Sequence, residues 1–206
     1  MLLKLDPAHP EESKLRYIAE CLQDDGIIIY PTDTVYGLGC HIHKPKAIEK
    51  VCRLKGIKVE KANFSFIFSD LSHLSEYTKA VDTPTYKIMR KALPGPFTFI
   101  LHAGSEIPKI FRTKKKTIGI RVPDNIICRE IVKTTESPLM NTSLHDENDE
   151  IHEYMNDPEE IHNKYHKLVD IVIDGGFGNL TASTVVDCSG GGVNIIRQGL
   201  GIIEGY

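Results

Sequence analysis

The order of the periodic segments is the feature that most limits the fold of this chain. Stretches with helical spacing of apolar residues alternate with short apolar runs at first, and only short runs separated by glycine turns follow. This order predicts a single α/β (α+β) domain over residues 1–206, a twisted mixed parallel and antiparallel sheet flanked by helices. The predicted strands are 27–30, 64–68, 97–101, 117–122, 169–173, 183–186 and 193–197. The predicted helices are 11–25, 44–55, 70–78, one opened by Thr83-Pro84, one capped by Asp124 and one opened by Asp157-Pro158.

Length and composition narrow the class of protein. The 206 residues are 41% hydrophobic and 26% charged, which suits one globular domain with its own core. No apolar run approaches the roughly 20 residues of a membrane helix, and the N-terminus becomes charged too early for a secretory signal. We therefore expect a cytoplasmic protein without a membrane partner. The scattered cysteines form no Cys-x-x-Cys pair, so we expect reduced thiols at Cys21, Cys40, Cys52, Cys128 and Cys188.

Charge is distributed unevenly along the chain, although its net value is only -3. Two basic clusters contrast with an acidic stretch, 134–163, that contains no Lys or Arg. Such separation creates a local positive field that attracts anions, while each cluster alone also fits a solvated surface. The first cluster is Lys44, Lys46, Lys50, Arg53, Lys55, Lys58 and Lys61, and the second is Arg112, Lys114, Lys115, Lys116 and Arg121.

A polar segment follows the first buried strand. Residues 30–39 read Tyr-Pro-Thr-Asp-Thr-Val-Tyr-Gly-Leu-Gly, and we interpret them as a loop. Ligands of α/β proteins gather beyond strand ends, where Thr32, Asp33 and Thr34 would offer hydroxyl and carboxylate oxygens. A threonine or Asx turn, with glycine at positive φ, accounts for the same residues equally well.

Cationic and hydroxyl side chains elsewhere are candidates for binding an anion. Thr117 and Arg121 lie four residues apart on a predicted strand, so both point to the same face and could meet one anion. Arg offers a bidentate fork to phosphate or carboxylate, whereas Lys is a point charge. Lys55 and Lys58 close a predicted helix and Arg197 lies on the last predicted strand, but each alone is better explained as a surface charge.

Other familiar catalytic patterns are missing. The pairs His41/His43 and His162/His166 lack a third ligand, so we predict no metal site. The glycine-rich run 174–179 matches neither a P-loop nor a dinucleotide fingerprint, and there is no Gly-x-Ser-x-Gly.

Several stretches follow one another in an order that covers nearly the whole chain. They are 30–39, 54–55, 93–101, 117–123, 138–143, 183–187 and 196–199. Taken together, these stretches resemble the YrdC/YciO family. The resemblance implies a YrdC-like fold with a basic concave face. It also implies an activity in which L-threonine, bicarbonate and ATP give threonylcarbamoyl-AMP and pyrophosphate, for the t6A modification of tRNA.

The resemblance implies roles for individual residues. Lys55 matches the lysine of the family's Lys-x-Arg motif and is the candidate catalytic residue. Mg²⁺ would arrive with the nucleotide. The implied threonine contacts are Thr34, Arg121 and Ser183, and the implied ATP contacts are Lys55, Thr117, Ser143 and Arg197.

Two positions depart from the family pattern. Ile57 stands where the Lys-x-Arg motif has arginine, and His145 stands where the Ser-x-Asn motif has asparagine. Lys58 could supply the missing charge at the nucleotide, although without a guanidinium fork. With the stretches 63–66 and 70–75, these departures resemble the YciO branch more than the YrdC branch.

The basic clusters support an alternative function, noncatalytic binding of double-stranded RNA or tRNA. Lysine and arginine side chains would then contact phosphates and make the affinity depend on salt. The two functions are compatible, since one basic face can serve both. The candidate RNA contacts are Lys46, Lys50, Arg53, Lys114, Lys115 and Lys116.

Overall fold

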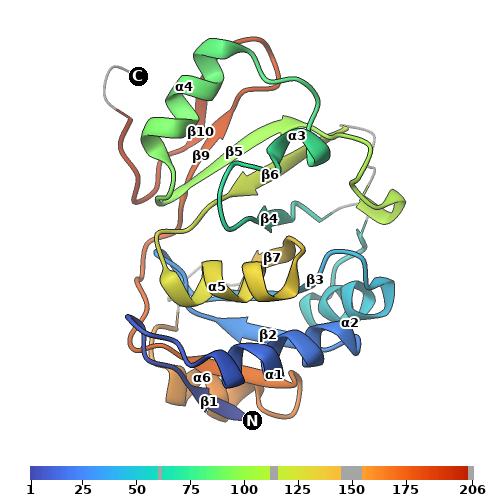
Figure 1. Ribbon diagram of the computed structural model, residues 1–206, viewed down its shortest axis with the longest axis vertical. Helices are drawn as coiled ribbons and strands as arrows, with labels where there is room; N and C mark the ends of the chain where they lie inside the picture. Colours follow the sequence, from blue (N-terminus) through green and yellow to red (C-terminus); the bar gives the residue numbers. More distant parts are fainter. Residues whose placement is uncertain (60–61, 112–115, 145–154, 204–206) are drawn as a thin grey trace.

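The computed structural model describes residues 1–59, 62–111, 116–144 and 155–203, built around one wide sheet (Figure 1). The strands are β1 (Leu2–Lys4), β2 (Ile27–Tyr30), β3 (Gly37–His41), β4 (Ser65–Ile67), β5 (Phe97–His102), β6 (Thr117–Arg121), β7 (Leu139–Ser143), β8 (Ile171–Asp174), β9 (Thr184–Asp187) and β10 (Asn194–Arg197). The helices are α1 (Glu12–Gln23), α2 (Pro45–Lys55), α3 (Leu74–Tyr77), α4 (Thr83–Ala92), α5 (Ile126–Thr135) and α6 (Pro158–Tyr165), with a 3-10 turn η2 (Lys109–Phe111).

All of these strands join one mixed sheet, in the order β1-β8-β2-β3-β7-β4-β6-β5-β9-β10. β8 pairs in parallel with β1 and β2, β4 with β6, and β5 with β9. The pairs β2–β3, β3–β7, β4–β7, β5–β6 and β9–β10 are antiparallel. The predicted fold class, a single α/β domain with a mixed sheet and flanking helices, is confirmed.

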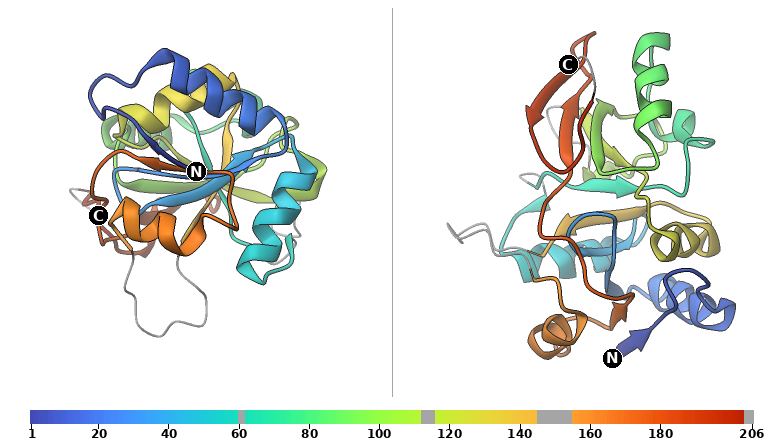
Figure 2. Two further views of the ribbon diagram at one scale, coloured as in Figure 1. Left: turned by 90° about the horizontal axis from the view of Figure 1, so that it is seen from below. Right: turned by 90° about the vertical axis from the view of Figure 1, so that its left-hand side faces the viewer.

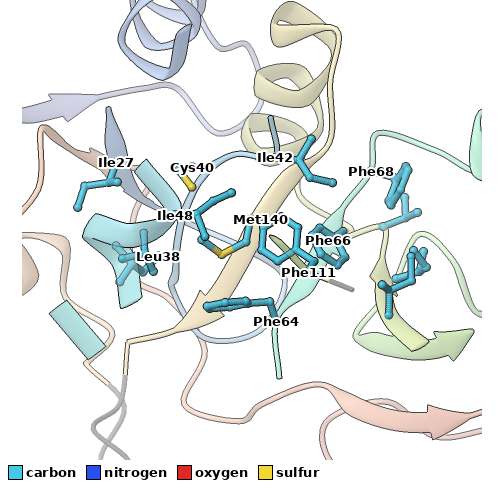
Figure 3. Close-up of a cluster of buried hydrophobic side chains, with 14 of the residues drawn as sticks. Ile27, Leu38, Cys40, Ile42, Ile48, Phe64, Phe66, Phe68, Phe111 and Met140 are labelled. Carbon is cyan, nitrogen blue, oxygen red and sulfur yellow. The ribbon is translucent and has the colours of Figure 1, made fainter. Parts of the chain in front are cut away.

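Alternate residues of the central strands point to opposite faces and build two cores. On one face, α1 and α5 bury Ile28, Tyr30 and Leu139. On the other face, the cluster that contains Leu38 and Phe66 packs against Ile48 of α2 (Figure 3). The same cluster includes residues of α6, α3 and α4. Figure 2 shows α1 and α5 on the opposite side of the sheet from α2 and α6.

The connection between β8 and β9, residues 175–183, crosses most of the sheet. These strands are second and ninth in the order, so seven inter-strand spacings separate them, about 33 Å in a flat sheet. The ten steps from Asp174 to Thr184 span at most about 33–36 Å when fully extended. Gly176, at φ 91°, shows that the connection is not fully extended. In Figure 1 the connection runs along one side of the sheet, from the β1 end at the bottom to the β10 end at the top.

Most predicted elements form close to their predicted bounds. The apolar stripe of α1 buries Leu15, Ile18 and Leu22. α2 buries its predicted apolar face and ends at Gly56, whose φ of 66° suits glycine. As the glycine-punctuated sequence predicts, the regular elements described after α6, up to residue 203, are strands.

Four local predictions are wrong or incomplete. β1, β3 and β7 were not predicted as strands, and the second half of the segment read as a loop, from Gly37, is β3. Glycine and Asn are poor strand formers, so tertiary pairing overrides propensity here. The cap of α5 is Asn125, whose side chain accepts from the Cys128 N–H, and not Asp124. Asp124 instead donates its backbone N–H to Asp33.

Most of the cysteines, and His41, are buried. Within the described residues, no three His, Cys, Asp or Glu side chains gather as metal ligands, and no helix is long and apolar enough to cross a membrane. All five cysteines are free thiols, and burial raises the pKa of Cys21 to about 11. His41 is buried, and its Nδ1 accepts the backbone N–H of His43 at 3.1 Å.

His41 makes the fold sensitive to acid. Burial lowers the pKa of His41 to about 4, below its usual 6.5, so the unfolded chain takes up the proton first. Between pH 6.5 and pH 4 the wild-type protein should therefore lose about 2–3 kcal/mol of unfolding free energy relative to His41→Gln, which does not titrate. Urea unfolding of both proteins at pH 7 and pH 4 measures this difference. Parallel losses in the two proteins would contradict it.

Candidate functional site

A buried ion pair fixes the loop between β2 and β3 to the end of β6. The Arg121 Nη2 donates to Asp33 Oδ1 and to Thr34 Oγ1, both at 2.9 Å. The side chains of Arg121 and Asp33 are only 6% and 8% exposed, and Thr34 is fully buried. Asp33 also accepts the backbone N–H of Asp124 at 3.0 Å. Each Asp33 carboxylate oxygen thus accepts one hydrogen bond, whereas the buried Nε of Arg121 has no hydrogen-bond partner among the described residues.

The loop itself is ordered by a threonine turn. Thr32 Oγ1 donates to the Val35 carbonyl at 2.8 Å and accepts the Thr34 N–H at 3.1 Å. The backbone N–H of Asn179, in the β8–β9 connection, donates to the Thr34 carbonyl at 3.1 Å. The threonine turn is confirmed, but the glycine at positive φ is not, because Gly37 and Gly39 lie in β3 and have no positive φ. The turn places the Thr34 hydroxyl against Arg121, so it does not exclude a binding role.

Burial and ion pairing act on Asp33 in opposite directions. Loss of hydration raises the pKa of Asp33 above its ordinary value, while the Arg121 guanidinium and the Asp124 N–H lower it. The net shift is upward. The Asp33–Arg121 ion pair therefore serves more to orient the Arg121 side chain than to raise the free energy of unfolding.

A second polar group joins β5, β9 and β10. Thr98 Oγ1 and Ser183 Oγ lie 2.8 Å apart, and Arg197 Nη2 donates to the Ser183 carbonyl at 2.8 Å. Phe99 pairs with Ile120, so one further step of that register places Thr98 opposite Arg121. The two polar groups are therefore neighbours on the same face of the sheet.

A third polar group lies on β7 and β4. It is on the same face of the sheet as Arg121, two residues along the strands from it. Tyr30 Oη donates to Asn141 Oδ1 at 2.7 Å, and Asn141 Nδ2 donates to Ser65 Oγ at 3.0 Å. Glycine makes room for it on β3: a Cβ at Gly37 would lie 2.3 Å from Asn141 Oδ1, and one at Gly39 would lie 3.1 Å from the Tyr30 ring.

Lys55 lies beside the far end of β7. As the last residue of α2 it donates from Nζ to the Ser143 carbonyl at 3.1 Å. Ser143 pairs with Gly37, two residues from Asn141 on the same face. Thr117 also lies on this face, and about 13 Å of strand separates its Cα from that of Arg121. The two could meet one ligand only if that ligand is longer than a single small anion.

The structure thus brings most predicted site residues together in two groups, although Lys55 reaches the Ser143 carbonyl from α2, which packs on the opposite face of the sheet. Thr34, Arg121, Ser183 and Arg197 form the first group, and Lys55, Ser143 and Thr117 lie toward the other end. Lys58 is exposed beyond α2 and no described contact joins it to either group. The departure at His145 falls outside the described residues.

The predicted RNA contacts lie elsewhere. Lys46, Lys50 and Arg53 are exposed on α2, where Lys50 donates to the Asp25 carbonyl and Lys46 lies 3.9 Å from its carboxylate. Lys116 is exposed at the start of the β6 region. Lys114 and Lys115 lie outside the described residues.

Sequence reasoning missed three polar residues of this face: Thr98, Asn141 and Ser65. Thr98 and Ser65 alternate with buried Phe97, Phe99, Phe64 and Phe66 on their strands, a pattern that signals a face of different polarity. Asn141 gave no comparable signal, because its partners come from other strands.

These features define a class: a single α/β domain on one wide mixed sheet, with cationic and hydroxyl side chains gathered on one face. The family model Sua5_yciO_yrdC, described as "Telomere recombination", matches residues 20–199. The chain therefore belongs to the Sua5/YciO/YrdC family.

Individual relatives place the chain near YciO within this family. Escherichia coli YciO is 34% identical over 203 residues, 98% of this chain and 97% of YciO. Its crystal structure has a TM-score of 0.90, covering 99% of this chain and 98% of that chain. A threonylcarbamoyl-AMP synthase of Nitrosococcus oceani is 31% identical over 130 residues, 63% of this chain and 70% of that protein. Pyrococcus abyssi Sua5 complexed with L-threonine shares the fold, with a TM-score of 0.82 and 20% identity over 97% of this chain and 57% of that one.

Arg121 should be the most sensitive position of the site. In Arg121→Gln the Asp33 carboxylate stays buried without its cation, so we expect a loss of about 3–5 kcal/mol of unfolding free energy. The double variant Asp33→Asn/Arg121→Gln should recover part of this loss. Chemical denaturation at pH 7 compares them. Without Arg121 the pKa of Asp33 rises further, so Asp33 takes up a proton in the folded variant as the pH falls. Lowering the pH toward 5 should therefore reduce the difference in unfolding free energy between Arg121→Gln and wild type. An increase in this difference would contradict this account.

Proposed function

We propose that this protein is a threonylcarbamoyl-AMP synthase, which uses L-threonine, bicarbonate and ATP. The observation that carries the proposal is the buried Arg121, which lies on a face rich in hydroxyl groups and is oriented by Asp33 and Thr34. Its Nε has no partner in the part of the chain that the structure describes. An oriented guanidinium of this kind suits a carboxylate, the group by which threonine would be held. Kinship with a named synthase supports the same function.

The two groups of polar residues suit the two halves of this reaction. Arg121, Thr34 and Ser183 would hold threonine, while Lys55, Thr117 and Ser143 would hold the nucleotide phosphates. Arg197, beside Ser183, would lie where the two ligands approach each other. The threonine amine would take up CO2 as a carbamate, and a carbamate oxygen would attack the α-phosphorus with departure of pyrophosphate. Positioning and neutralisation of charge would then supply most of the catalysis.

Magnesium fits this site as a companion of the nucleotide. The Asp33 carboxylate is occupied by Arg121 and the Asp124 N–H, and the described residues hold no cluster of metal-binding side chains. Hydroxyl and cationic groups suit phosphate oxygens better than a divalent ion. When bound, Mg²⁺ would neutralise phosphate charge, and Lys55 would add a positive charge from the protein.

Incubation with ATP, threonine and bicarbonate tests the proposal directly, with the adenylate and pyrophosphate as readouts. Lys55→Ala should lower the rate of product formation about 10- to 100-fold, because one positive charge is removed from the phosphates. Lys133→Ala, an exposed lysine of α5 paired with Glu130, is the matched control and should keep the wild-type rate. Failure of the wild-type protein to form product or to bind ATP would exclude the proposed function.

We also propose a second candidate function, binding of double-stranded RNA or tRNA, on the exposed cations of α2. Each phosphate that the protein neutralises releases counterions. Lys46→Ala and Arg53→Ala should therefore weaken binding to all RNA sequences. Each should also reduce the slope of log affinity against log salt concentration by about 1. Fluorescence anisotropy with a tRNA and a short RNA duplex, at rising salt, measures this. Affinity unchanged by salt or by these substitutions would rule the surface out.

A further inference from the structure

Ser65 occupies the point where the two groups of the proposed site meet. On β4 it pairs with Gly119 of β6 on one side and with Asn141 of β7 on the other. Thr117 and Arg121 lie two residues to either side of Gly119 on the same face, and Ser143 lies two residues beyond Asn141. The hydroxyl of Ser65 therefore lies between the residues proposed for threonine and those proposed for the nucleotide.

A buried hydrogen-bond chain sets the direction of this hydroxyl. Tyr30 is fully buried and donates to Asn141 Oδ1, which leaves the Asn141 amide to donate to Ser65 Oγ. Asn141 itself is only 4% exposed. Since Ser65 Oγ accepts from Asn141, its own proton is available to donate outward, and a donor at the end of such a chain is strengthened by its neighbours.

Gly119 keeps the space beside Ser65 open. A Cβ at Gly119 would lie 3.0 Å from Thr98 Cγ2 and 3.4 Å from Ser65 Cβ, so a side chain there would occupy the gap between two hydroxyl-bearing residues. Ser65 is partly exposed, in contrast to the buried Phe64 and Phe66 beside it. The hydroxyl is thus both oriented and accessible.

We propose that Ser65 is a catalytic residue of the proposed synthase and that Asn141 is its positioning residue. This inference rests on the proposed function. The Ser65 hydroxyl donates a hydrogen bond to a nonbridging oxygen of the α-phosphate while the carbamate oxygen forms its bond to phosphorus. The bond from that phosphorus to the bridging oxygen breaks, and pyrophosphate leaves with the electron pair. No proton moves from Ser65, so the residue stabilises charge without becoming a nucleophile.

The test separates rate from binding. Ser65→Ala should lower kcat for threonylcarbamoyl-AMP formation about 10- to 100-fold, because a donor to the reacting phosphate is lost. Its threonine affinity, measured by calorimetry, should stay within about twofold of wild type, because Arg121 and Thr34 are unchanged. Ser65→Thr keeps a hydroxyl and should retain kcat within about threefold. Equal kcat in wild type and Ser65→Ala would overturn the catalytic role.

Two further variants separate positioning from stability. Asn141→Ala removes the bond to Ser65, whereas Tyr30→Phe removes only the far end of the chain and leaves that bond in place. Both lose a buried hydrogen bond, so both should unfold at lower denaturant, but only Asn141→Ala should lose kcat several-fold. Equal effects on kcat would overturn the positioning role. Absence of product with the wild-type protein would instead reject the proposed function, and the inference with it.

Discussion

The structure depends on the burial of one guanidinium group. Arg121 ends a central strand at the point where the apolar face under α5 gives way to a polar face: its register neighbour is Ile67, while two residues earlier Gly119 faces Ser65. An unpaired charge cannot be buried there without a large cost, so the Asp33 carboxylate must come with it. That requirement ties the β2–β3 loop to a strand 88 residues away in sequence and fixes the Thr34 hydroxyl beside the cation.

Small side chains allow the other polar groups to pack closely on the polar face. Glycine on β3 and β6 lets the Tyr30 ring, the Asn141 amide and the Thr98 methyl group come close to the sheet. The hydroxyl groups of Ser65 on β4, of Thr98 on β5 and of Ser183 just before β9 then lie on one face of the sheet, with Arg121 and Arg197 beside them. Such a surface can bind a polyanion by many modest contacts while no buried polar atom of these side chains except Arg121 Nε lacks a partner within the described residues.

The sequence predicts the outer helices better than the central strands. The apolar period of α1 and α2 and the Asp-Pro start of α6 are local signals, and these helices form as predicted. β3 and β7 contain Gly and Asn for reasons that lie in neighbouring strands, so no local pattern identifies them. The same holds for the site: family motifs predicted Arg121 and Ser183, whereas Ser65 and Asn141 become visible only through register. The role of Lys58 stays a prediction: it lies three residues after Lys55, is exposed, and makes no described contact with the other candidate residues.

The β8–β9 connection has a consequence for how the molecule is made. During synthesis, β1 and β2 emerge early, but β8 must insert between them, and β9 must join the opposite end of the sheet. The nascent chain can therefore build the middle strands first, and both borders of the sheet form only after β8 and β9 have been synthesised. Ser183 and Arg197 also follow β8 in the chain, so the polar face is completed after the middle strands.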